Sequence, residues 1–337
     1  MPVLILISIV TNTLVVIVLL KKHMRYPTNV FLAGIAFSDM FTGLSPLATW
    51  LHFYALGNYR DFVPYKLCLT YIITIRVLPT VFHTASIWIT TALTIQRYVY
   101  VCHGLKARRW PCTIIKVVYC IIAIYVASIL SHLTEFITFS FIPIEVTSRL
   151  NPNETMVSCI HEYSAWVVDH EYLYVSIYTW FIVICLNLIP CTVLVVLNTL
   201  LILPLRTAKR RWMLLLNQNE RCLSMRLKDR NSTTRMLVVV VSLFLLAEIP
   251  LGTVNVIFII QYTFEIAYMT NESVSIIAST IEFIILLTFP LNLCIYCGMS
   301  RQFRTTFKQL FKCQCLNINI DPRPTVIFKN CNNMDKE

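Results

Sequence analysis

Residues 236–262 read MLVVVVSLFLLAEIPLGTVNVIFIIQY, with Glu248 as the single charged residue. A helix needs about 17–25 apolar residues to cross a bilayer, so this stretch is long enough to span one. Its apolar residues form a continuous run, whereas a strand of an outer-membrane barrel alternates apolar and polar residues. The stretch therefore predicts a membrane-spanning α-helix, which we place at Met236–Tyr262.

Six further apolar runs accompany it. They are Val3–Leu20, Val30–Leu51, Leu67–Val101, Ile114–Ile142, Tyr172–Leu205 and Val274–Met299. With 57% hydrophobic residues, 13% charged residues and a mean hydropathy of +0.69, the chain is too apolar for a water-soluble enzyme or a disordered protein. We predict an all-α fold, an integral membrane bundle of seven transmembrane helices over residues 1–299, with no second folded domain.

Basic residues produce the net charge of +11, and most of them lie in alternate loops and in the C-terminal tail. The largest group lies between the fifth and sixth runs and consists of Arg206, Lys209, Arg210, Arg211, Arg221, Arg226, Lys228, Arg230 and Arg235. Positively charged loops stay in the cytoplasm, so we expect a multi-pass plasma-membrane protein with an extracellular N-terminus and a cytoplasmic C-terminus. The basic residues would then contact anionic membrane lipids, and they do not indicate nucleic acid. Sequons at Asn153 and Asn271 fall in predicted outer loops and predict glycosylation there.

Polar residues inside the runs form two motifs. The third run contains Phe82-His83-Thr84-Ala85-Ser86 and ends in Gln96-Arg97-Tyr98, and the last run contains Phe289-Pro290-Leu291-Asn292-Leu293-Cys294-Ile295-Tyr296. Polar groups are costly in lipid, so such residues indicate internal contacts or function. The two motifs together resemble those of rhodopsin-like G-protein-coupled receptors, and within them the invertebrate FMRFamide-like, myosuppressin and sex-peptide receptor group. The resemblance extends from about Asn12 to Phe311.

The resemblance implies a switch at the cytoplasmic side. Its members would be Arg97, Tyr98, Asn292, Tyr296 and Pro250. Arg97 would pair within the protein at rest and meet a heterotrimeric G protein when the helix containing Pro250 swings outward. The chain departs from the family pattern at Gln96, which replaces an acid, at Leu293, which replaces a proline, and at Arg230, where many relatives carry an acid. We therefore expect the resting state to be held only weakly. The alternative is that Arg97 merely extends to the lipid headgroups.

A second implied site lies in the middle of the membrane. The family places a sodium-binding polar cluster at positions that match Asp39, Ser86, Thr288 and Asn292. Glu248 stands two residues before Pro250, where the family has a tryptophan, and would add a second carboxylate. Since like charges repel at close range, one of the two carboxylates would then carry a proton. The alternative is a water-filled polar core without an ion, and no other metal is predicted.

Most of the 13 cysteines lie inside the runs as small apolar residues. The resemblance implies a disulfide between Cys68, at the mouth of the third run, and Cys159, in the second outer loop. Cys68 lies 29 residues before Arg97, which is long for the family and predicts an extra turn. Residues 300–312 form an amphipathic stretch that predicts a membrane-surface helix, followed by a cytoplasmic tail over residues 313–337. Cys313 and Cys315 predict palmitoylation sites, and the alternative is two free thiols.

The outer loops and the outer ends of the runs carry more acids than bases, which would attract a cationic ligand. Together with the resemblance, this predicts a short amidated extracellular peptide of the FMRFamide-like type, ending in Arg-Phe-amide. Glu282 should face the bundle rather than lipid and is the first candidate partner of the ligand's arginine, and Glu135 is the second. Phe82, His83 and Phe283 would form the floor beneath the ligand's phenylalanine, with a packed interior histidine as the alternative for His83.

The sequence contains no zinc-protease, nucleophile-elbow or phosphate-loop motif and no double Cys-x-x-Cys pattern, so we expect neither an enzyme nor a bound cofactor. The last run contains no lysine, which excludes a retinal Schiff base. Two other functions remain. One is a chemoreceptor for a small molecule on the same fold. The other, which we consider much weaker, is a seven-helix transporter, which would tend to show repeated halves.

Overall fold

The computed structural model of the chain describes residues 2–57, 61–109, 111–151, 153–217, 221–264 and 270–312. Within these residues, seven helical spans are long and apolar enough to cross a membrane. They run over Pro2–Leu19, Pro27–Phe53, Tyr65–Cys102, Ile114–His132, Ser176–Thr207, Ser232–Gln261 and Ser279–Met299. The prediction of an all-α seven-helix bundle is confirmed.

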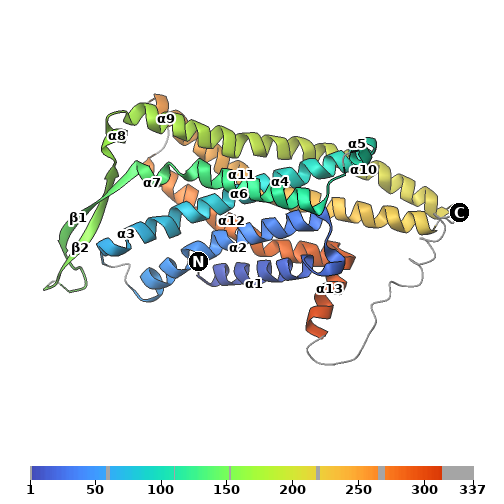
Figure 1. Ribbon diagram of the computed structural model, residues 1–337, viewed down its shortest axis with the longest axis horizontal. Helices are drawn as coiled ribbons and strands as arrows, with labels where there is room; N and C mark the ends of the chain where they lie inside the picture. The colour runs from blue at the N-terminus through green and yellow to red at the C-terminus, as the bar shows by residue number, and fades with distance from the viewer. Residues whose placement is uncertain are drawn as a thin grey trace.

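Figure 1 shows the spans side by side, with a β-hairpin at one end of the bundle and a short helix across the other. The helices of the bundle are α1 (Pro2–Leu19), α2 (Pro27–Trp50), α3 (Tyr65–Ile72), α4 (Leu78–Cys102), α6 (Ile114–His132), α9 (Glu171–Phe181), α10 (Ile189–Asn217), α11 (Arg221–Phe264) and α12 (Asn271–Met299). Short helices connect or follow them, namely α5 (Gly104–Arg109), α7 (Glu135–Thr138), α8 (Ala165–Val168) and α13 (Arg301–Lys312).

Local sequence signals explain several helix starts. Pro27 stands in the first turn of α2, where its missing N–H needs no partner. Thr113 caps α6 by accepting a hydrogen bond from the Lys116 amide, and Thr270 caps α12 in the same way. A 3₁₀ turn at Lys22–Met24 connects α1 to α2.

The main apolar core lies in the half of the bundle that contains α13. Val18, Leu32, Leu93 and Leu237 are buried there together with Tyr296 and Phe303. Phe303 of α13 is 1% exposed, and its ring centre lies 5.6 Å from that of Tyr296. The predicted surface helix is therefore anchored to the bundle through an aromatic contact.

The fourth predicted spanning helix, Ile114–Ile142, is wrong in its C-terminal part, which does not continue the helix. α6 ends at His132, and residues Phe139–Thr147 form strand β1, which pairs antiparallel with β2 (Thr155–Tyr163). Pro143 fits the strand, because inside a helix a proline would remove a backbone hydrogen bond and clash with the preceding turn. In the two-stranded hairpin both strands are edges, where a proline is tolerated.

Three π-helical segments interrupt the helices, at Leu51–Ala55, Ile73–Val77 and Ile182–Leu188. A π-turn closes i to i+5 and so contains one more residue than an α-turn. The second segment lies between Cys68 and Arg97, where the sequence predicted an extra turn. It accommodates part of the extra length without ending the helix.

Candidate functional site

The hairpin is tied to the bundle by a covalent bond. Cys68 of α3 and Cys159 of β2 form a disulfide, with their Cα atoms 6.5 Å apart. Next to it, the Ser158 hydroxyl donates a 2.8 Å hydrogen bond to the Val63 carbonyl. Asn153 lies in the turn between the two strands. Asn271 begins α12, and its side chain lies outside the described residues.

A second tie joins the hairpin to the loop before α3. The Asp61 carboxylate accepts hydrogen bonds from the Ser148 hydroxyl at 2.6 Å and from the Arg149 amide at 2.9 Å. The Arg149 guanidinium lies 4.5 Å from the ring centre of Phe62. These hydrogen bonds, that from Ser148 first, lower the pKa of Asp61 because they favour the charged carboxylate. Sequence reasoning missed this tie.

Glu135, the second predicted partner of the ligand, has partners within the protein. Its carboxylate is 9% exposed and lies 3.4 Å from Arg76 Nε, 3.3 Å from His132 Nδ1 and 3.4 Å from the Tyr178 hydroxyl. Burial alone would raise the pKa of Glu135, but the hydrogen bond to His132 and the charge of Arg76 hold it below its usual range. His132 in turn contacts Thr84 Oγ1 at 3.1 Å. Glu135 therefore joins three helices and is already paired.

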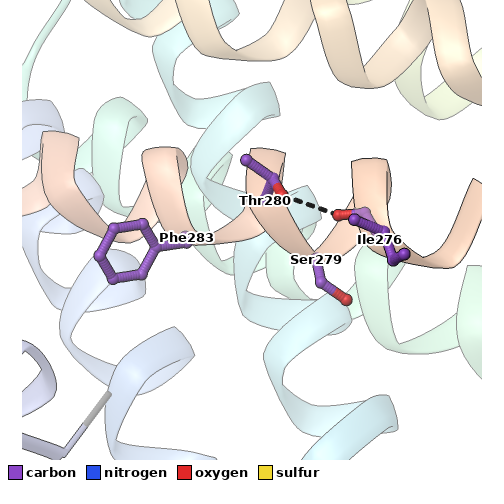
Figure 2. Close-up of a pocket in the computed structure, with 4 residues that line it drawn as sticks. All are labelled: Ile276, Ser279, Thr280 and Phe283. Carbon is purple, nitrogen blue, oxygen red and sulfur yellow. Dashed lines mark hydrogen bonds between the residues drawn. The ribbon is translucent and has the colours of Figure 1, made fainter. Parts of the chain in front are cut away.

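Glu282 and Phe283 lie on the outer half of α12. Glu282 is exposed, and its charge is close enough to interact with that of His83. Phe283 lines an open cleft of about 400 Å³ together with Ile276, Ser279 and Thr280. Figure 2 shows these four side chains along α12, where the Thr280 hydroxyl donates a 2.8 Å hydrogen bond to the Ile276 carbonyl.

The other predicted floor residues have different neighbours. The Phe82 ring stacks on Phe41 at 5.1 Å and meets Tyr125 edge-on at 6.2 Å, so it packs between α4, α2 and α6. His83 Nε2 lies 3.0 Å from Glu248 Oε1. Neither contact places these side chains beside the cleft at Phe283. The alternative for His83, an interior histidine, describes its position better.

The polar core forms around Asp39, which is 3% exposed. The Ser86 hydroxyl donates a 2.7 Å hydrogen bond to Asp39 Oδ1, and the Asn292 amide donates one of 3.3 Å to Asp39 Oδ2. The Thr288 hydroxyl is bonded to the Ile285 carbonyl of its own helix. Glu248 does not join the cluster as a directly paired second carboxylate, because its partner is His83. The Asp39 carboxylate and the Ser86 hydroxyl oxygen fit a small hard cation.

The inner end of α4 presents Arg97, which is partly buried and, among the described residues, has no hydrogen-bond partner at Nε. Gln96, which replaces the family's acid, faces Thr28 of α2 with their side-chain oxygens 3.4 Å apart. The Tyr98 ring lies 5.4 Å from that of His103, and Tyr296 is 1% exposed. The side chain of Arg230 lies outside the described residues, as do Cys313 and Cys315.

Seven helices that are long and apolar enough to span a membrane, a disulfide-tied hairpin at one end, a buried polar core and an arginine near the far end of α4 define the class of seven-helix membrane receptors. The family model described as "Serpentine type 7TM GPCR chemoreceptor Srw" matches residues 1–314. The chain belongs to this family of serpentine G-protein-coupled receptors, and not to a family of enzymes.

Three relatives make the comparison more specific. A sex peptide receptor of Drosophila melanogaster is 40% identical over 316 residues, which cover 92% of this chain and 71% of the relative. Sex peptide receptor-related protein 2 of Caenorhabditis elegans is 34% identical, over 92% of this chain and 70% of the relative. An FMRFamide peptide receptor of the same nematode is 28% identical, over 63% of this chain and 47% of the relative.

Proposed function

We propose that this chain is a receptor for a short extracellular peptide and that binding of the peptide activates a heterotrimeric G protein. The 40% identity to a sex peptide receptor across 92% of the chain carries this proposal. The same relationship favours a peptide over a small odorant, although the family description includes chemoreceptors.

The proposed orientation puts the hairpin outside the cell and α13 inside. A disulfide and a sequon at Asn153 suit the extracellular side, where disulfides persist and glycosylation occurs. α13 contains Arg301, Arg304, Lys308 and Lys312, which would contact anionic lipid at the inner surface. We place the receptor in the plasma membrane, with 300–312 as a membrane-surface helix and 313–337 as a tail palmitoylated at Cys313 and Cys315.

We infer that the ligand is cationic and amidated, of the FMRFamide-like type. Glu282 supports this, because it is an exposed acid on the outer half of α12 for which the described residues provide no ion-pair partner within 4 Å. A ligand arginine can form two parallel charged hydrogen bonds with such a carboxylate. The cleft at Phe283 would accept an aromatic side chain next to it. Glu135 supports the proposal less, since Arg76 and His132 already contact its carboxylate.

Signal transfer in this proposal follows the family pattern. The part of α11 that precedes Pro250 would move away from α4, which would expose Arg97 and Tyr98 to the G protein. Asn292 and Tyr296 lie on one face of α12 and connect the polar core to the inner core around Phe303.

The test is a nucleotide-exchange assay on surface-expressed receptor. Three ligand sets are compared, namely amidated peptides ending in Arg-Phe, the same peptides with a free carboxyl end, and small odorants. We expect exchange only with the amidated peptides. A response to odorants alone would identify a chemoreceptor instead.

A further inference from the structure

His83 of α4 and Glu248 of α11 form a buried pair near the centre of the bundle. Their nearest side-chain atoms, Nε2 and Oε1, lie 3.0 Å apart, and Glu248 is 0% exposed. Among the described residues, no geometrically aligned hydrogen bond satisfies either Glu248 oxygen or either His83 nitrogen. A charge buried in this way is costly unless an opposite charge compensates it. The imidazole is the group placed to do so.

Acidic side chains of three helices surround His83. Carboxylates interact with it from three helices, namely Asp39 of α2, Glu248 of α11 and Glu282 of α12. Cys191 of α10 interacts with Glu248. Glu248 is the acid in direct contact with His83, at 3.0 Å, so a protonated imidazole compensates its charge directly. Glu248 and His83 therefore form an ion pair between α4 and α11.

The pair involves the part of α11 that precedes its internal proline. Glu248 stands two residues before Pro250, where the helix lacks a backbone N–H. Because α11 runs from the inner to the outer side in the proposed orientation, Glu248 belongs to the half that must move during activation. A bond from this half to α4 opposes the movement.

We propose that the His83–Glu248 ion pair holds α11 against α4 in the resting receptor, and that a ligand cation bound at Glu282 weakens it by repelling the imidazolium. This inference rests on the proposed function. It adds a contact that stabilises the resting state, which the sequence pattern did not predict. The chain has Gln96 where the family carries the acid of its resting contact, so the His83–Glu248 pair would hold the resting state at a different place. His83 acts here through Glu248 and is a positioning residue.

The experiment measures nucleotide exchange without agonist, normalised to receptor at the cell surface. Glu248→Gln and His83→Gln remove one charge each with little change in size. We expect either variant to raise basal exchange about fivefold or more, the lower range of allosteric coupling. The double variant should be no more active than either single one, because both remove the same interaction. Glu272→Gln, an exposed acid in the first turn of α12, is the matched control and should match the wild type.

Two results would overturn the lock. One is that both single variants show the same basal exchange per surface receptor as the wild type. The pair would then have only a structural role, even if fewer receptors reached the cell surface. The other is an additive double variant. Spin labels at the exposed positions Leu105 and Val239 give a readout independent of G proteins, since their separation should increase in Glu248→Gln. If the wild type activates no G protein with any peptide, the proposed function fails, and the label distances still decide whether the lock exists.

Discussion

The Ser86 hydroxyl donates a 2.7 Å hydrogen bond to the Asp39 carboxylate across the contact between α4 and α2. Both side chains are almost fully buried, so the carboxylate in the middle of the membrane accepts a hydrogen bond from Ser86 in place of one from water. Asn292 adds a third helix to the same carboxylate. Asp39 is thus the point where α2, α4 and α12 meet through polar atoms.

Asp39→Asn should abolish any effect of sodium on agonist affinity. The amide keeps the shape of the side chain but removes the charge that would hold the cation. Agonist competition binding in sodium chloride and in choline chloride measures this effect, with Ser86→Ala expected to weaken it. An equal sodium effect in Asp39→Asn and the wild type would favour the alternative of a water-filled core.

Arg97→Ala should lose G-protein activation while keeping agonist binding. Arg97 lies in the last turns of α4, and none of the residues that line the cleft at Phe283 belongs to α4. Agonist affinity and nucleotide exchange are measured on the same membranes, with Arg109→Ala as a control arginine in α5. Intact activation at normal surface expression would assign Arg97 to headgroup contact instead.

Glu282→Gln should lower the potency of an Arg-containing peptide about tenfold or more, because it removes one partner of a charged pair. A tenfold loss corresponds to about 1.4 kcal/mol of binding free energy. The same peptide with citrulline in place of arginine should lose much less. Concentration–response curves for the two peptides on both receptors form a double-mutant cycle. Equal losses for the two peptides, or no loss for either, would show that Glu282 does not meet the arginine.

The tie between Asp61 and the hairpin should depend on pH. Because the pKa of Asp61 is lowered in the folded protein, the tie contributes stability above the ordinary value of 3.8 and loses it as the pH falls through the lowered folded value. The amide signal of Arg149, followed by NMR in selectively labelled protein, should titrate with a midpoint below 3.8. In Asp61→Asn this titration should disappear, and a midpoint at or above 3.8 would contradict the tie.

Gly252→Ala should destabilise the contact between α11 and the π-helical segment that precedes α10. A Cβ atom at position 252 would overlap the side-chain oxygen of Asn187, which lies in the π-helical segment Ile182–Leu188. Overpacking of this kind costs about 1–3 kcal/mol. The thermal midpoint of purified receptor should fall, and Asn187→Ala in the same chain should restore part of it. Gly298→Ala, with open space around position 298, is the control.

The spans and the polar core could be predicted because their signals are local or shared with a family. Each span is a continuous apolar run, and the resemblance to the receptor family implies the grouping of Asp39, Ser86 and Asn292. The hairpin was missed because Phe139–Ile142 continues an apolar run, and the significance of Pro143 was overlooked. Apolar length alone does not separate a helix end from a strand.

The sequence could not predict which charged residues pair with one another, because the partners lie on different helices or loops. Whether Glu135 is available depends on Arg76 and Tyr178, which lie on other helices. The bond from Ser148 to Asp61 joins residues 87 positions apart. His83 and Glu248 were each noticed, but their contact depends on how α4 and α11 pack, which no spacing in one helix determines.

The π-helical segments at Leu51–Ala55, Ile73–Val77 and Ile182–Leu188 also affect how this receptor can be aligned with its relatives. Each behaves as a single-residue insertion that the helix accommodates in place. If a relative lacks the insertion, every position on the outer side of it shifts by one residue, which is about 100° around the helix axis. Outer-pocket residues carried over by counting along α2, α4 or α10 would then point to the wrong neighbour. α12 is α-helical throughout Asn271–Met299, so counting outward from Asn292 to Glu282 keeps its register.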